Sequence, residues 1–186
     1  MELIKAIYTR QSIGKVRPDP VPRELVEEIL DAGATAPNHR RLRPWRFVVL
    51  TGNARMRLGD LMAQAILERN PGAIPEQLDV ERRKPLRAPV LIAVGVDKPG
   101  QDKITEMENI SACAAAVENM LLAAHDMGLG AIWRTGGAVE NPKVKTFLGL
   151  EPDQHLIAIV YLGYSDMQPV QIERPLAADR TRWMDE

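Results

Sequence analysis

The chain has 186 residues, a net charge of −1, 45% apolar and 26% charged residues, a composition that is ordinary for soluble globular proteins. This length matches one domain, so we expect a single core built from residues 1–186. The balanced charge excludes a general attraction to nucleic acid or anionic membranes, and no apolar run is long enough to span a bilayer. The single cysteine, Cys113, excludes an internal disulfide and, with an N-terminus unlike a signal peptide, predicts a cytoplasmic protein.

Apolar periodicity and turn residues divide the first half of the chain into elements. In chain order we first expect a helix over residues 2–8, with Leu3, Ile4 and Ile7 on one face, and a helix from Pro22 to near Gly33. A strand over residues 46–50 and a helix capped by Asn53 follow. We then expect a surface loop with a helical turn over residues 70–89 and a strand over residues 90–96. The last of these is nearly all apolar, which is typical of a strand covered on both faces.

The second half begins with the longest predicted helix, over residues 104–127, whose centre at residues 112–117 has little side-chain bulk. Small residues let backbones approach closely, so we expect this helix in the middle of the fold or of a dimer. In chain order we then expect a stop at Gly128 or Gly130, a strand from Ala131, a helix from Asn141 to Gly149, a strand over residues 156–162, and an extended tail over residues 165–186. Helices and strands alternate irregularly, which predicts an α+β fold with a central sheet flanked by helices.

Arg10, Gln11 and Ser12 follow the first helix directly. An arginine fork with amide and hydroxyl donors is the set that best holds a phosphomonoester, which offers several acceptor oxygens and about −1.5 to −2 charges. A polar, solvated helix end explains the same residues.

The segment Thr35-Ala36-Pro37-Asn38-His39 lies just past the second predicted helix. Its proline and asparagine favour a turn, and a lone histidine in such a loop is usually solvated. The following Pro44-Trp45-Arg46-Phe47 is typical of a strand entry.

Trp133, Arg134 and Thr135 lead into Gly136 at the end of a short apolar strand. Backbone N–H groups in such a turn and a flanking arginine can donate hydrogen bonds to a bound ring. A buried tryptophan beside an exposed arginine is the alternative interpretation.

Several kinds of site are not indicated by the sequence. It has no Gly-x-Gly-x-x-Gly after a strand, no Walker-type phosphate loop and no Gly-x-Ser-x-Gly elbow. His39, His125 and His155 are far apart and lack ligand partners at metal-binding spacing, so we expect no metal site. Cys113 lies among alanines and is predicted to be an inert core residue.

Three segments in this order, residues 9–13, 36–47 and 128–137, resemble the flavin-binding parts of the nitroreductase family, especially its short NAD(P)H nitroreductase members. The most specific match is Ile132-Trp133-Arg134-Thr135-Gly136. The resemblance implies a nitroreductase-like fold with a mainly antiparallel sheet, non-covalent FMN, and a homodimer with active sites at the interface. It also implies that the tail, residues 165–186, is swapped onto the partner subunit.

The same resemblance implies the cofactor-binding residues. By it, Arg10, Gln11 and Ser12 contact the flavin phosphate and ring edge, Thr35 and His39 reach the flavin of the partner, and Trp133, Arg134 and Thr135 contact the ring. Many relatives have Asn then Gln before Pro-Trp-Arg-Phe, whereas this chain has Leu42 and Arg43, so the role of Arg43 stays open. Which of Arg174, Arg180 and Arg182 contacts the phosphate, if any does, is open as well.

The implied activity is an NAD(P)H-dependent FMN oxidoreductase that reduces nitro-aromatic, quinone or similar electron-poor acceptors by ping-pong hydride transfer. The flavin carries the chemistry, so no catalytic side chain is expected. The alternatives are a flavin-dependent dehalogenase or flavin-processing enzyme of the same fold, a non-catalytic flavin-binding protein, and a structural protein without flavin. The sequence leaves open the acceptor and the choice of NADH or NADPH. It places the residues that gate the substrate slot only by elimination, in residues 70–86 or 99–108.

Overall fold

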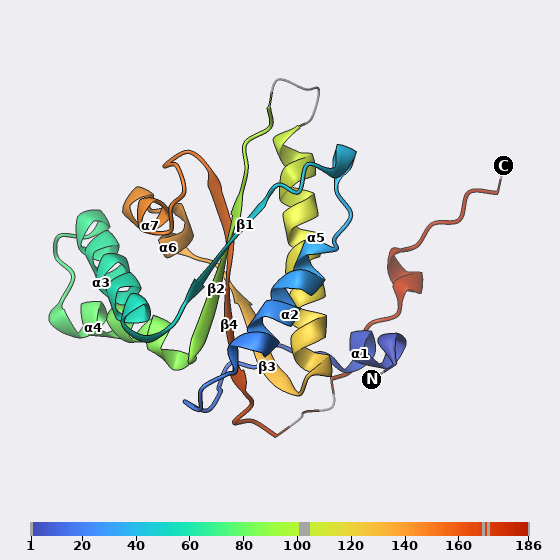
Figure 1. Cartoon of the computed structure of the whole chain (residues 1–186), viewed down its shortest axis with the longest axis horizontal. Coiled ribbons are helices and arrows are strands. Elements are labelled where there is room, and N and C mark those ends of the chain that lie inside the picture. The colour runs from blue at the N-terminus through green and yellow to red at the C-terminus, as the bar shows by residue number, and fades with distance from the viewer. Residues whose placement is uncertain (1, 101–104, 169, 171, 186) are drawn as a thin grey trace.

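The computed structural model describes residues 2–100, 105–168, 170 and 172–185, and its helices pack on the two faces of one sheet (Figure 1). The helices are α1 (Leu3–Thr9), α2 (Arg23–Ala34), α3 (Gly52–Arg69), α4 (Pro75–Arg83), α5 (Glu106–Asp126), α6 (Gly137–Glu140) and α7 (Pro142–Phe147). The 3-10 turns are η1 (His39–Arg41), η2 (Lys84–Arg87) and η3 (Ala177–Arg180). The strands are β1 (Trp45–Leu50), β2 (Val90–Val96), β3 (Leu129–Arg134) and β4 (His155–Tyr164).

The sheet has the strand order β1-β2-β4-β3, and every neighbouring pair is antiparallel. All residues of the central strand β2 are buried, because helices cover both of its faces as its apolar run predicts. The predicted bounds of β2 are confirmed, while β3 begins two residues earlier than predicted and β4 extends beyond both of its predicted ends. The α+β fold with an antiparallel sheet flanked by helices is confirmed.

The two faces of the sheet carry different helices. Figure 1 shows α2 and α5 on one face and α3, α4, α6 and α7 on the other. Side chains alternate along a strand, so Ile92 and Val94 pack toward α5 while Leu91 and Ala93 pack toward α3 and α7. Each face therefore has its own apolar core.

Helix α5 lies directly on the sheet because its inward side chains are small. Ala116 and Cys113 are fully buried, and the Cys113 thiol lies 4.0 Å from the carbonyl oxygen of Gly95 on β2. The helix begins with a capping box, in which the Thr105 hydroxyl accepts from the Glu108 amide and the Glu108 carboxylate accepts from the Thr105 amide. Gly128, with φ of +76°, follows its last turn as predicted. The predicted first residue of this helix, residue 104, lies outside the described residues.

Two predictions about the first half are wrong. The stretch predicted as a loop with a helical turn contains the nine-residue helix α4, which starts at Pro75 and buries none of its residues. Since an apolar stripe is what identifies a helix in a sequence, a helix without buried residues gives little signal. The third helix is preceded by Thr51 and starts at Gly52, so Asn53 lies inside its first turn and does not cap it.

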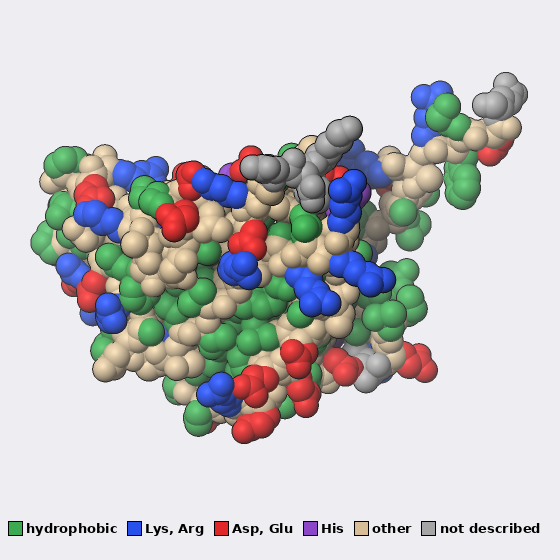
Figure 2. Space-filling model, turned by 45° about the horizontal axis from the view of Figure 1, so that its top comes forward, with side chains coloured by type: hydrophobic (Ala, Val, Ile, Leu, Met, Phe, Trp, Pro, Cys, Tyr) green, Lys and Arg blue, Asp and Glu red, His purple; other side chains and the backbone are tan. Residues whose placement is uncertain are grey.

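Apolar side chains stay exposed on α1 and on the tail. The predicted apolar face of α1 forms, but Leu3 and Ile4 are 67% and 63% exposed. The tail leaves the body near α1 and is extended apart from η3, and Figure 2 shows its end standing clear of the body. On that tail Trp183 is 83% exposed. Over the described part of the chain, no helix combines the length and apolar character needed to cross a membrane.

Candidate functional site

The segment after α1 lies along the edge strand β3. The amide of Ile13 donates to the carbonyl of Ala131 at 3.0 Å, and a Cβ on Gly14 would lie 3.7 Å from a guanidinium nitrogen of Arg134. The approach is close because β3 has a glycine there: a Cβ on Gly130 would lie only 2.7 Å from the Ile13 side chain. The residues directly after Arg10–Ser12 therefore lie along β3, the strand that ends just before Thr135.

Arg10 is held in place by its neighbours on α5 and the tail. Its Nε lies 3.3 Å from a carboxylate oxygen of Glu118, its side chain is 19% exposed, and Arg174 of the tail donates to its carbonyl oxygen. Burial, followed by the positive charge of Arg10, lowers the pKa of nearby His125. The ion pair with Glu118 therefore orients the guanidinium of Arg10.

Gln11 and Ser12 extend this set of donors. Gln11 is half-buried and Ser12 is exposed, and neither side chain has a hydrogen-bond partner among the described residues. An oriented guanidinium beside an uncommitted amide and hydroxyl is a donor set that fits a phosphate group.

Trp133 and Arg134 point to opposite faces of the sheet, as neighbours on a strand do. The Trp133 indole packs against the α5 core and donates to the carbonyl of Ile157 at 2.9 Å, so it has a structural role. Arg134 lies on the α3 face, with its guanidinium 5.9 Å from the centre of the Tyr161 ring. After Thr135 comes Gly136 with φ of +121°, a conformation that favours glycine and leaves this turn without side-chain bulk.

Thr35 and His39 lie apart from this edge. The Thr35 hydroxyl donates to the carbonyl of Ala32 and is 3.4 Å from the amide of Asn119. His39 lies 3.7 Å from Glu108 near the start of α5. Since Arg10 pairs with Glu118, it is separated from His39 by about 15 Å along α5 at 1.5 Å per residue. Within one chain the structure does not bring His39 to Arg10 or Arg134.

The loop that carries His39 is basic and conformationally unusual. Arg40, Arg41 and Arg43 all have positive φ, between 49° and 57°, which is uncommon for bulky residues. The amide of Arg43 donates to the side chain of Asn38, so Arg43 belongs to this loop and lies away from Arg10. Among the described residues of the tail, Arg174 is the one arginine that contacts the Arg10 segment, and Arg180 lies in η3, further along the tail.

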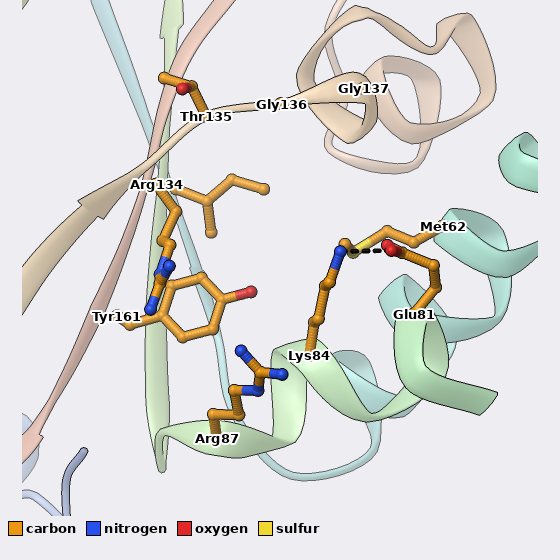
Figure 3. Close-up of a pocket in the computed structure, with 10 residues that line it drawn as sticks. Met62, Glu81, Lys84, Arg87, Arg134, Thr135, Gly136, Gly137 and Tyr161 are labelled. Carbon is orange, nitrogen blue, oxygen red and sulfur yellow. Dashed lines mark hydrogen bonds and ion pairs between the residues drawn. The ribbon is translucent and has the colours of Figure 1, made fainter. Parts of the chain in front are cut away.

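A cavity of about 150 Å³ opens beside Arg134 on the α3 face (Figure 3). Its walls are formed by Met62, Glu81, Lys84, Arg87, Arg134, Thr135, Gly136, Gly137, Ile159 and Tyr161. Figure 3 shows Arg134 lying along the Tyr161 ring, while Lys84 and Arg87 of η2 face the same space. Burial raises the pKa of the Tyr161 hydroxyl, which therefore stays protonated at neutral pH.

Sequence analysis missed most of this cavity. Residues 70–86, one of the two ranges suggested for the substrate slot, supply Glu81 and Lys84, but Arg87 and Tyr161 were not identified. The available signal was the cation spacing in Lys84-Pro85-Leu86-Arg87 directly before a buried strand. Among the described residues no group of three His, Cys, Asp or Glu side chains could hold a metal ion.

Comparison with known proteins identifies the relatives of this chain. The model described as "Nitroreductase family" matches residues 7–164. The chain belongs to the nitroreductase family. Membership places it among the oxidoreductases, as the sequence predicts, and agrees with its fold.

Individual relatives are similar over nearly their whole length. YdjA of Escherichia coli (strain K12), a proposed NAD(P)H nitroreductase, is 30% identical over 164 residues, which is 88% of each protein. A nitroreductase-like family protein from Bacillus cereus has a structure similar to this one with a TM-score of 0.88 and 25% identity, covering 100% of this chain and 97% of that one. A nitroreductase homologue from Desulfovibrio desulfuricans, solved in complex with FMN, has a TM-score of 0.73 and 28% identity, covering 96% of this chain and 94% of that one.

Proposed function

We propose that this protein is an FMN-dependent NAD(P)H oxidoreductase that reduces nitro-aromatic, quinone or similar electron-poor acceptors, with two flavin sites in a homodimer. The observation that carries the proposal is the packing of Ile13 and Gly14, directly after Arg10–Ser12, against Ala131 and Arg134 of the edge strand β3. The similarity to a family structure solved with FMN supports the choice of cofactor.

The residues present fit a flavin mononucleotide by the chemistry of their donors. Arg10, Gln11 and Ser12 would hold the phosphate, since a guanidinium, an amide and a hydroxyl match its acceptor oxygens. Arg134 and the backbone amides of the Thr135–Gly136 turn would donate to the ring. When bound, FMN takes a hydride from NAD(P)H and passes reducing equivalents to the acceptor. The chain's own groups bind, orient and shield, and none of them is required as a nucleophile.

A second copy of the chain is needed for the rest of the proposed site. His39 lies about 15 Å along α5 from the Arg10 level, and the Thr35 hydroxyl is held by Ala32 and Asn119, so on this proposal both serve the flavin bound by the partner. The exposed apolar residues of α1 and of the tail favour the same arrangement, because large exposed apolar groups usually mark an interface. On this proposal the tail packs on the partner subunit.

The first test is an absorbance spectrum of the purified protein followed by anaerobic titration with NADH and with NADPH. The proposal expects bound flavin that is bleached by one or both reductants and restored by a nitro-aromatic acceptor. A protein that binds no added FMN, judged by melting temperature and by spectrum, would overturn it. Bound flavin that no reductant bleaches would instead favour a non-catalytic flavin-binding protein.

The Arg10→Ala variant tests the phosphate assignment. Loss of one charged hydrogen-bonding partner costs about 1.5–3 kcal/mol, so the FMN dissociation constant should rise roughly 10- to 150-fold. Equilibrium dialysis measures this constant, and Arg23→Ala, which removes an exposed i,i+4 ion pair with Glu27 instead, is the control. Equal FMN affinity in the two variants would contradict the assignment.

A further inference from the structure

Next to the cavity beside Arg134 lies a second cavity of about 240 Å³. The two share the wall residues Met62, Glu81, Lys84 and Gly137, and the second adds Arg69 from the end of α3. Arg69 contacts the turn after β3, because a Cβ added to Gly137 would lie 2.4 Å from the Arg69 guanidinium. The two neighbouring cavities are called here the α3–α4 groove; the first borders the proposed flavin ring contacts, and the second lies beside Arg69.

The α3–α4 groove is positively charged. Its walls carry Arg69, Lys84, Arg87 and Arg134 against a single carboxylate, Glu81, which pairs with Lys84. Within the part of the chain that the structure describes, no carboxylate pairs with Arg69, Arg87 or Arg134. Three guanidinium groups around one groove attract an anion and offer it paired N–H donors.

We infer that the α3–α4 groove binds the diphosphate of NAD(P)H while the nicotinamide reaches the flavin beside Arg134. This inference rests on the proposed function, because it assigns the reductant a place next to the same flavin. Arg87 and Arg69 would donate to the phosphate oxygens. The Tyr161 hydroxyl reaches the same space and has no hydrogen-bond partner among the described residues, so it is available as a further donor.

The length of the groove favours the reductant over the electron acceptor. A nitro-aromatic or quinone is one compact ring system, often uncharged, and would fill the first cavity only. The first cavity, of about 150 Å³, is smaller than the roughly 300–1,000 Å³ typical of ligand sites, and the second lies directly beside it. A dinucleotide has an aromatic end and, further along, two negative charges, which matches a ring site that opens into a cationic groove.

The test compares reductants with and without phosphate on the FMN-loaded protein. Flavin reduction is followed anaerobically by stopped-flow with NADH and with 1-benzyl-1,4-dihydronicotinamide, which has the same reacting ring and no charge on its substituent. In Arg69→Gln, which alters only the second cavity, the dissociation constant for NADH should rise about 10-fold or more, as expected for a lost charged hydrogen bond. Reduction by the benzyl compound should be unchanged. Arg83→Gln, an exposed arginine of α4 outside both cavities, is the control.

Salt and a flavin-independent ligand give two more readouts. The NADH affinity of the unmodified protein should fall as salt rises, and this dependence should be weaker in Arg69→Gln/Arg87→Gln. ADP-ribose keeps the diphosphate and lacks the nicotinamide, so its calorimetric binding to the protein should be lost in the double variant and kept in Arg83→Gln.

Each outcome separates the inference from the proposed function. Unchanged NADH and ADP-ribose binding in the double variant would overturn the inference while flavin reduction by the benzyl compound continued to support the function. If the double variant instead had a raised KM for 4-nitrobenzoate but not for 4-nitrobenzyl alcohol, with NADH binding intact, the groove would bind anionic acceptors. That result would also overturn the inference. If the protein binds no FMN, the proposed function fails, and ADP-ribose binding still decides whether the groove takes a diphosphate.

Discussion

The two faces of the sheet solve different physical problems. On the α5 face, Ala116, Cys113 and Val117 are fully buried and the helix lies close on the strands. On the α3 face, long charged side chains such as Lys84 and Arg87 border two neighbouring cavities, Lys84 both of them and Arg87 the first. A charged group cannot be buried without a partner, so the space beside these side chains stays open to solvent and ligand. The α5 face is therefore closely packed, whereas the α3 face contains cavities lined by charged side chains.

The largest expected contrast is in the reactivity of Cys113, the only cysteine in the chain. Burial raises the pKa of its thiol to about 12, so almost no reactive thiolate is present at pH 8. Labelling by a disulfide reagent should be at least about 1,000-fold slower than in urea-unfolded protein, because it waits for the α5 face to open. Rapid labelling of protein with a native circular dichroism spectrum would show that this face is not tightly packed.

A cavity made in the tight face should be costly. Met120 of α5 is fully buried, and truncating a buried methionine to alanine costs about 2–5 kcal/mol. Urea unfolding of Met120→Ala measures this loss, with Met56→Ala as the control because Met56 on α3 is 48% exposed. Similar losses in both variants would remove the distinction between the two faces.

The groove face should be sensitive where its two helices cross. A Cβ on Gly59 of α3 would lie 2.2 Å from the carbonyl oxygen of Arg82, so α4 must move to accept it. Gly59→Ala should cost about 1–3 kcal/mol, the usual range for overpacking, and displace the wall that carries Glu81 and Lys84. Gly100→Ala, which meets no atom within 4 Å, is the control for urea unfolding. Full stability in Gly59→Ala would contradict the crossing.

The smallest expected effect is the pH dependence of the α5 cap. The Thr105 amide, and then its hydroxyl, lower the pKa of Glu108. A lowered pKa in the folded state gives stability that is present above the unfolded value of about 4.3 and is lost as pH falls through the folded value. Glu108→Gln should therefore lower the melting temperature slightly at pH 7 and not at pH 3. Glu173→Gln in the exposed tail should show no such difference, and equal behaviour of the two variants would exclude the cap.

The sequence predicted the strands and the long helices, and it missed the helices α4 and α6. The all-apolar run of β2 and the stop at Gly128 are visible because burial and a positive φ restrict which residues fit. Helix α4 could not be predicted because it has no buried residues and therefore no apolar stripe. Residues 10–12 and 133–135 could be named by resemblance, whereas the packing of the segment after residue 12 against β3 depends on tertiary contacts such as Ile13 with Ala131.

The cationic groove could not be predicted from the sequence either, because it too depends on tertiary contacts. Arg69 lies on α3, Lys84 and Arg87 on η2 and Arg134 on β3, and in the sequence each one alone is an ordinary surface cation. Only the packing of α3 and η2 against the turn after β3 places them around a common space. The positive charge of the groove is therefore a property of the tertiary structure and of no single segment of the sequence.

The tryptophans give the molecule its own optical reporters. Trp45 is 8% exposed in the core, Trp133 is half-buried with its indole N–H bonded to the sheet, and Trp183 is 83% exposed on the tail. An indole in water emits at longer wavelength than one in an apolar setting. The fluorescence of Trp183 therefore senses whatever surface comes to cover the tail, while the other two indoles supply a constant background.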